Sequence, residues 1–152
     1  MKLKIALLQL MPGKNIKEQY QKGESACRQA KQMGADIALF PEMWSDGYYL
    51  PQTPGSIDKL AISKDSDFVT GFQKLSKELQ MAIAITFLEK NYPKPLNSVI
   101  VFDRFGKEAL HYSKVHTCAF DLEKILSEGD RFHVADLNTD SGTVKIGAMI
   151  CF

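Results

Sequence analysis

Short apolar runs that alternate with amphipathic stretches constrain the fold of this chain most. Residues 3–10 form an apolar run, and the sequence turns helical from Asn15, which forms a capping-box pattern with Glu18. Gly34 is expected to end this helix, and a second run, ADIALF at residues 35–40, follows it. Because ADIALF is apolar apart from Asp36, we expect both of its faces to be covered, as in parallel sheets. This order favours an α/β fold.

A second helix and further strands follow a loop rich in Pro, Gly and Ser. Phe68, Phe72, Leu75 and Leu79 recur at helical spacing and predict an amphipathic helix, after which residues 81–89 predict a strand. Turn signals predict two hairpins, the first with strands at residues 97–103 and 108–114 and the second with strands at residues 132–138 and 143–150. Residues 115–131, between the hairpins, are expected to form a loop or short helix. With no repeat or linker, residues 1–152 are expected to form one domain.

The composition limits the partners and the compartment. With 45% hydrophobic and 24% charged residues, the chain has enough apolar material for one core, and a net charge of +1 argues against nucleic-acid or membrane partners held by bulk electrostatics. Cys27, Cys118 and Cys151 form no CxxC pair, and an odd number of cysteines favours a reducing compartment. No signal peptide or membrane-span pattern is seen, so we expect a cytoplasmic protein.

Three chemically distinct side chains follow predicted strands. Glu42 comes after ADIALFP, Lys114 ends EALHYSK, and Cys151 ends VKIGAMIC, where we expect a buried strand to run up to the thiol. Each residue alone has a simpler interpretation: a solvated carboxylate, a surface lysine, and a cysteine that fills the core. Because ligands gather outside strand ends in α/β sheets, the three can also meet there and support acyl transfer by a thiol nucleophile.

A metal site is an alternative interpretation of the same region. His111, His116 and Cys118 lie close together in sequence, with His133 farther on. The spacing H-x4-H-x-C matches none of the compact zinc patterns, and His111 is expected within a strand while His116 lies in a loop. We therefore predict no metal.

Three segments together resemble the signatures of a known family. ALFPEMW, HYSKVH and IGAMICF are similar, in that order, to the signature segments of the nitrilase superfamily, the carbon-nitrogen hydrolases that cleave amides, nitriles and N-carbamoyl compounds. The resemblance spans the whole chain. It implies a four-layer α-β-β-α sandwich, of which this chain supplies roughly the first half. It also implies a homodimer or higher homo-oligomer and no metal or organic cofactor.

The resemblance also implies roles for particular residues. Glu42 matches the family's general base, Lys114 its catalytic lysine and Cys151 its nucleophile. In FDLEKILSEGD, Glu123 resembles the further glutamate that orients the substrate and the lysine, with Glu128 as a rival.

The substrate pocket is predicted from the residues near these three groups. Trp44, Tyr48 and Phe120 are candidate walls, although aromatic residues after a strand also serve simple packing. The backbone N–H of Phe152 is a candidate donor to the developing oxyanion. The expected substrate is a small-molecule amide, nitrile or N-carbamoyl compound, with an amide as first choice.

Where the chain stops gives a second functional interpretation. Members of the family continue well past the nucleophilic cysteine, whereas this sequence stops at Phe152, so we expect the domain to be incomplete at its C-terminus. An incomplete sandwich exposes an edge and an apolar face. The alternative function is therefore a catalytically inactive structural or interaction module.

Overall fold

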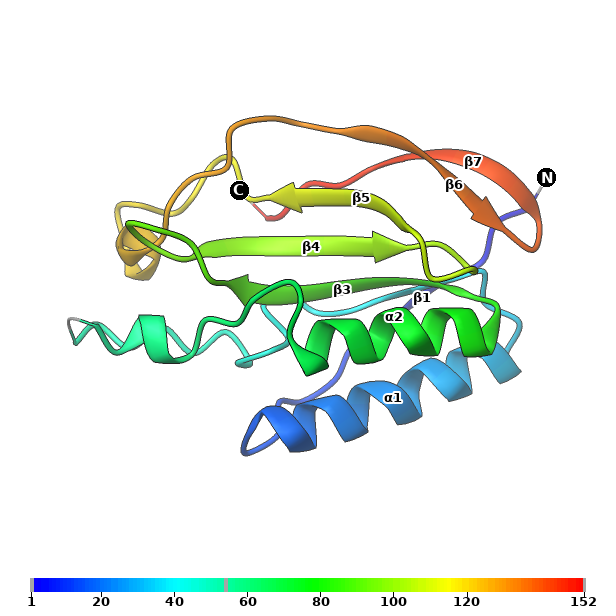
Figure 1. Ribbon diagram of the computed structural model, residues 1–152, viewed down its shortest axis with the longest axis horizontal. Coiled ribbons are helices and arrows are strands. Elements are labelled where there is room, and N and C mark those ends of the chain that lie inside the picture. Colours follow the sequence, from blue (N-terminus) through cyan, green and yellow to red (C-terminus); the bar gives the residue numbers. More distant parts are fainter. Residues whose placement is uncertain (1, 54, 152) are drawn as a thin grey trace.

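The computed structural model describes residues 2–53 and 55–151 and has three layers (Figure 1). Helices α1 (Ile16–Gln32) and α2 (Asp67–Leu79) cover one face of a five-stranded sheet, and the hairpin of β6 (Val134–Thr139) and β7 (Gly142–Gly147) covers part of the other. The sheet has the order β1 (Ile5–Leu7), β2 (Ile37–Leu39), β3 (Ala82–Glu89), β4 (Leu96–Phe102), β5 (Glu108–Ser113). Two short 3-10 helices, η1 (Ile57–Lys59) and η2 (Leu122–Ile125), lie in the connecting loops.

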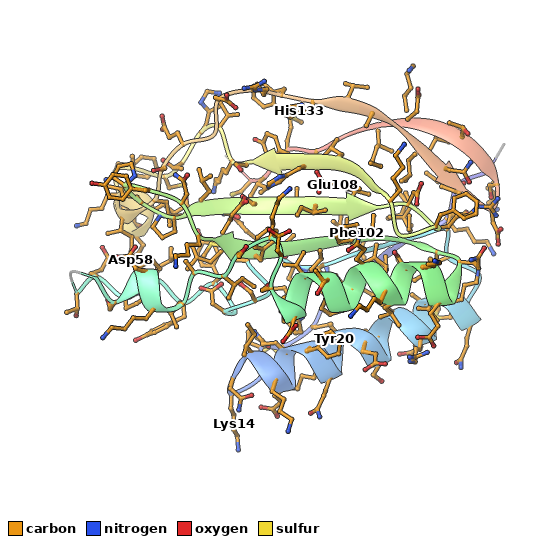
Figure 2. The ribbon with its side chains drawn as sticks, in the orientation of Figure 1. Lys14, Tyr20, Asp58, Phe102, Glu108 and His133 are labelled. Carbon is orange, nitrogen blue, oxygen red and sulfur yellow. The ribbon has the colours of Figure 1, made fainter. Side chains whose placement is uncertain are left out.

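The sheet is mixed, as the order of elements predicted. Strands β1, β2 and β3 run parallel, whereas β3, β4 and β5 are joined as antiparallel neighbours. Phe102 and Glu108, both labelled in Figure 2, are register partners beside the β4–β5 turn. Asn97 and Lys114 therefore lie at the opposite end of this strand pair, and that end carries the polar groups described below.

The predicted helix signals are present in the structure. Asn15 caps α1, since its side-chain oxygen accepts a hydrogen bond of 3.0 Å from the backbone N–H of Glu18. Gly34 follows the helix with a φ of +77°, a left-handed conformation that glycine adopts without strain. Ser66 caps α2 in the same way. Within the described residues, neither helix is long and apolar enough to cross a membrane.

The last predicted strand is shorter than expected. Strand β7 ends at Gly147, which pairs with Val134 at the start of β6, and residues 148–151 are not part of a strand. The expectation of a buried strand running up to Cys151 is therefore wrong, because beyond Val134 the hairpin offers no further strand partner. Met149 is 81% exposed, and Cys151 has a positive φ of 48°.

The helical layer packs closely enough that one glycine is required. Tyr20 of α1, labelled in Figure 2, packs against Phe72 of α2 with ring centroids 5.0 Å apart. Beside them, a Cβ added to Gly23 would lie 2.7 Å from Phe40 and 2.8 Å from Phe72. Both rings are buried, so the core has no room for the extra methyl group.

Gly23→Ala is therefore expected to destabilise the fold by about 1–3 kcal/mol through overpacking. Alanine in place of glycine normally stabilises an exposed helix position by about 1 kcal/mol, so the predicted sign is the reverse of the usual one. Thermal unfolding followed by circular dichroism measures the effect. Ser25→Ala, on the exposed side of α1, is the control and should leave the melting temperature nearly unchanged. A raised melting temperature in Gly23→Ala would contradict the packing argument.

Candidate active site

Lys114 lies between two carboxylates at the end of β5. Its side chain is fully buried, and its Nζ donates to Oε1 of Glu42 at 3.1 Å and to Oε1 of Glu123 at 2.9 Å. The backbone N–H of Lys114 donates to the carbonyl of Asn97 on the neighbouring strand β4 at 2.8 Å. The end of the strand pair therefore fixes the lysine backbone, and the two glutamates fix its ammonium.

Glu42 comes from the turn that follows β2. This turn has a positive φ at Met43 (51°) and at Gly47 (68°), and it is held to β3 by a hydrogen bond of 3.1 Å from the backbone N–H of Trp44 to Oγ1 of Thr86. The Glu42 side chain is 25% exposed, unlike Lys114. Its Oε1 also accepts a hydrogen bond of 2.7 Å from Nδ2 of Asn97. Glu42 therefore joins the buried lysine to the surface.

Glu123, rather than its rival Glu128, contacts the lysine. Glu123 lies in η2 with its side chain 1% exposed, and besides Lys114 it accepts hydrogen bonds from the hydroxyl of Tyr48 at 2.8 Å and the backbone N–H of Cys118 at 2.7 Å. Glu128 accepts instead from the hydroxyl of Thr117. The loop at residues 115–131 thus folds so that η2 turns a carboxylate inward, beneath the lysine.

The two buried charges stabilise each other. Burial on its own lowers the pKa of the Lys114 ammonium, but hydrogen bonds to Glu123 and Glu42 outweigh it and raise that pKa above its usual value. Burial raises the pKa of Glu123, but hydrogen bonds from Cys118, Lys114 and Tyr48 bring it below its usual value. Lys114 is thus held as an ammonium and Glu123 as a carboxylate.

Cys151 shares a cavity with Glu42. The thiol residue is exposed, and both residues line a cavity of about 340 Å³ between the five-stranded sheet and residues 146–151. In Figure 1 the chain returns after β7 to the end of the sheet where β5 stops. The interpretation of Cys151 as buried core filler does not hold for this structure. Glu42 and Cys151 thus line one cavity, and Lys114, which does not line it, is hydrogen-bonded to Glu42.

The predicted pocket walls lie elsewhere. Trp44 is 1% exposed and packs in the core beneath the helices, with its Nε1 donating to the carbonyl of Gln19 at 3.2 Å, so its predicted role as a pocket wall is wrong for this cavity. Tyr48 binds Glu123, and Phe120 is 80% exposed; neither lines the cavity. The predicted donor Phe152 lies outside the described residues.

Sequence reasoning missed Asn97. It is fully buried in β4, yet it donates to Glu42. The available signal was an amide at the start of the otherwise apolar run NSVIVF, next to a strand that ends in the candidate lysine.

The histidines of the alternative metal site are not gathered. Nε2 of His111 lies 2.8 Å from a carboxylate oxygen of Glu89, on the far strand β3. Across residues 2–53 and 55–151, no group of three or more His, Cys, Asp or Glu side chains is arranged to hold a metal ion.

Comparison with known proteins then decides the family. Residues 4–152 match the sequence profile of the family described as carbon-nitrogen hydrolase. The chain belongs to this family. The predicted membership of the nitrilase superfamily is therefore confirmed.

Individual relatives agree with the profile. Nitrilase homolog 2 of Dictyostelium discoideum is 25% identical to this chain, in an alignment that covers 98% of this chain and 46% of the relative. The nitrilase of Pyrococcus abyssi is 29% identical, in an alignment that covers 94% of this chain and 51% of the relative. The chain thus spans about half the length of these curated relatives.

Solved structures show the same fold. The amidase of Nesterenkonia sp. AN1 superimposes with a TM-score of 0.81 at 18% identity, over 99% of this carbon-nitrogen hydrolase chain and 58% of the amidase. Another structure of that amidase shows acrylamide added to its active-site cysteine. The predicted fold class is confirmed: the chain has a nitrilase-like α/β architecture, covering about half of the sandwich.

Proposed function

We propose that this chain carries the reacting groups of a thiol hydrolase that cleaves a non-peptide carbon-nitrogen bond in a small-molecule amide, nitrile or N-carbamoyl compound. The observation that carries the proposal is that an exposed thiol and a carboxylate line one cavity, while a buried ammonium is hydrogen-bonded to that carboxylate; the three groups come from separate parts of the sequence. Family membership supports it. The names of the relatives include both nitrilases and an amidase, and we favour an amide as substrate.

The first half-reaction forms a thioester. Cys151 gives its proton to Glu42, and its sulfur bonds to the carbonyl carbon of the amide while the C–O π electrons move to oxygen. The Lys114 ammonium stabilises that oxyanion electrostatically. When the tetrahedral intermediate collapses, the C–N bond breaks and Glu42 returns the proton to the departing amine.

The second half-reaction releases the acid. Glu42 takes a proton from a water molecule as the water oxygen attacks the thioester carbon. The C–S bond then breaks, the carboxylic acid leaves, and the proton returns to the sulfur. Glu42 performs every proton transfer in this scheme, because Lys114 is held in its charged form and serves the oxyanion better than it would serve as a base.

The test is ammonia release from a panel of small amides, nitriles and N-carbamoyl compounds, with and without prior iodoacetamide. We expect turnover of at least one class, abolished by alkylation of Cys151 as located by peptide mass analysis. Absence of turnover together with absence of selective Cys151 labelling would favour the inactive interaction module instead. The predictions of self-association and of a cytoplasmic location stay predictions.

Lys114→Arg tests the placement of the positive charge. A guanidinium keeps the charge but is larger and planar, and the lysine site is fully buried between two carboxylates. We expect the acylation rate to fall about 100-fold, comparable to the loss of one oxyanion donor. Pre-steady-state measurement of the thioester burst gives this rate. Lys74→Arg, at an exposed lysine of α2, is the control, and a fully retained acylation rate in Lys114→Arg would contradict the proposed role.

A further inference from the structure

Asn97 contacts both candidate catalytic groups of the sheet. It is fully buried in β4, its Nδ2 donates to Oε1 of Glu42 at 2.7 Å, and its backbone carbonyl accepts the N–H of Lys114 at 2.8 Å. A single residue thus holds the side chain of one group and the backbone of the other. Because β4 is paired on both sides, with β3 and with β5, this support comes from an interior strand of the sheet.

The two oxygens of Glu42 are not equivalent. Asn97 and Lys114 both donate to Oε1, from different strands, and no described residue donates to Oε2. Two donors on one oxygen stabilise negative charge there and prevent rotation of the carboxylate. The second oxygen is then the one available for proton exchange at the cavity that Glu42 shares with Cys151.

Packing alone does not explain an amide at this position. Oδ1 of Asn97 is buried and accepts no hydrogen bond from any described residue, which is unfavourable in an interior. Leucine has the same number and branching of side-chain heavy atoms, contains no polar atom and is common at buried positions. A purely structural role would therefore favour leucine, whereas a role toward Glu42 requires the amide donor.

We infer that Asn97 is a positioning residue that holds Oε1 of Glu42 and so directs Oε2 to exchange the proton with Cys151. The inference rests on the proposed function of Glu42 as the base. It adds a residue that touches neither the substrate nor the sulfur and acts on the reaction through the orientation of another side chain.

The test measures the alkylation rate of each cysteine by iodoacetamide in the full chain, resolved by peptide mass analysis. Cys27 is buried, and burial raises the pKa of its thiol to about 12, so it reports loss of the fold. Burial and the Glu123 carboxylate raise the pKa of Cys118, which gives a slow internal reference near the site. In Asn97→Leu we expect the Cys151 rate to fall at least tenfold, with the Cys118 rate and the melting temperature nearly unchanged.

Ser98→Ala is the matched control. Ser98 is the next residue in β4, equally buried, and its hydroxyl bonds to Ser113 rather than to Glu42. This variant should keep the Cys151 rate within about twofold of the unaltered chain. If Asn97→Leu does not fold, Asn97→Ala decides by the same criteria, because it removes the donor without adding volume or charge.

Three results would overturn the inference. If Cys151 reacts selectively in the unaltered chain but equally fast in the folded Asn97 variant, the inference alone fails. An equal fall of the Cys151 alkylation rate in Ser98→Ala would show that any change in this strand slows the thiol, and would also refute the inference. If Cys151 in the unaltered chain reacts no faster than Cys118, the proposed base is absent, and the proposed function fails together with the inference.

Discussion

Replacing Cys151 by alanine is expected to lower kcat for amide hydrolysis on the order of a million-fold, because the variant has no atom that can form the thioester. The fold should be unaffected, since Cys151 is exposed and follows the last strand rather than belonging to it. Two measurements check the result: ammonia release on the substrate found by the panel, and intact mass after incubation with iodoacetamide. Alanine should remove both turnover and the fast-reacting thiol.

Cys118→Ala is the matched control for this variant. Cys118 lies in the loop before η2, and its backbone N–H donates a hydrogen bond of 2.7 Å to Glu123. Alanine keeps that N–H, so turnover should change little. Activity that survives in Cys151→Ala or disappears in Cys118→Ala would assign the nucleophile to the other thiol.

Lys114→Met is expected to lower the free energy of unfolding by about 3–5 kcal/mol, the typical cost of breaking a buried ion pair from one side. The variant keeps the aliphatic stem but leaves Glu123, which is 1% exposed, without its cation. The double variant Lys114→Met/Glu123→Gln should recover a large part of the loss, because the amide carries no charge to bury. Urea unfolding at neutral pH measures all three chains.

The loss of unfolding free energy in Lys114→Met is expected to become smaller as the pH is lowered. The pKa of Glu123 is lowered in the folded chain, so its contribution to stability is present above its unfolded pKa and is lost as the pH falls through the folded value. The unaltered chain therefore loses stability in acid, and the variant can protonate the unpaired carboxyl. We expect the gap between them to narrow as the pH is lowered. A deficit below about 1 kcal/mol at neutral pH, or an equal deficit in Lys74→Met at an exposed lysine, would contradict the buried-pair argument.

Much of the fold could be predicted because its signals are local. The cap at Asn15 and the helix end at Gly34 are set by a few neighbouring residues, and the hairpins by turn signals between apolar runs. The end of β7 could not be predicted in this way. Whether residues after Gly147 join a strand depends on where the partner strand starts, at Val134, and the apolar character of GAMI carries no information about that.

The sequence predicted those residues of the candidate site that come directly after a strand. Glu42 and Lys114 come directly from that rule. Trp44 was misplaced because the turn after Glu42 has a left-handed residue, Met43, which directs the indole back into the helical core. Asn97 was missed because a polar residue at a strand start is usually a solvated end, and only the arrangement of the strands in the sheet brings it against the candidate base.

The hairpin of β6 and β7 is a separate two-stranded sheet, and this has a consequence for how reactivity is controlled. The carboxylates, the ammonium and Asn97 all depend on the five-stranded sheet or its loops, whereas the thiol follows the hairpin, which packs on that sheet through buried Leu137. The proton acceptor and the sulfur are therefore carried by two separate sheets, joined by apolar packing and by polar contacts such as those of Arg104 with Asn138 and Asp140. A shift of the β6–β7 hairpin relative to the five-stranded sheet would move the thiol away from Glu42 while the charged cluster stayed assembled. We therefore expect activity to be lost before the chain unfolds.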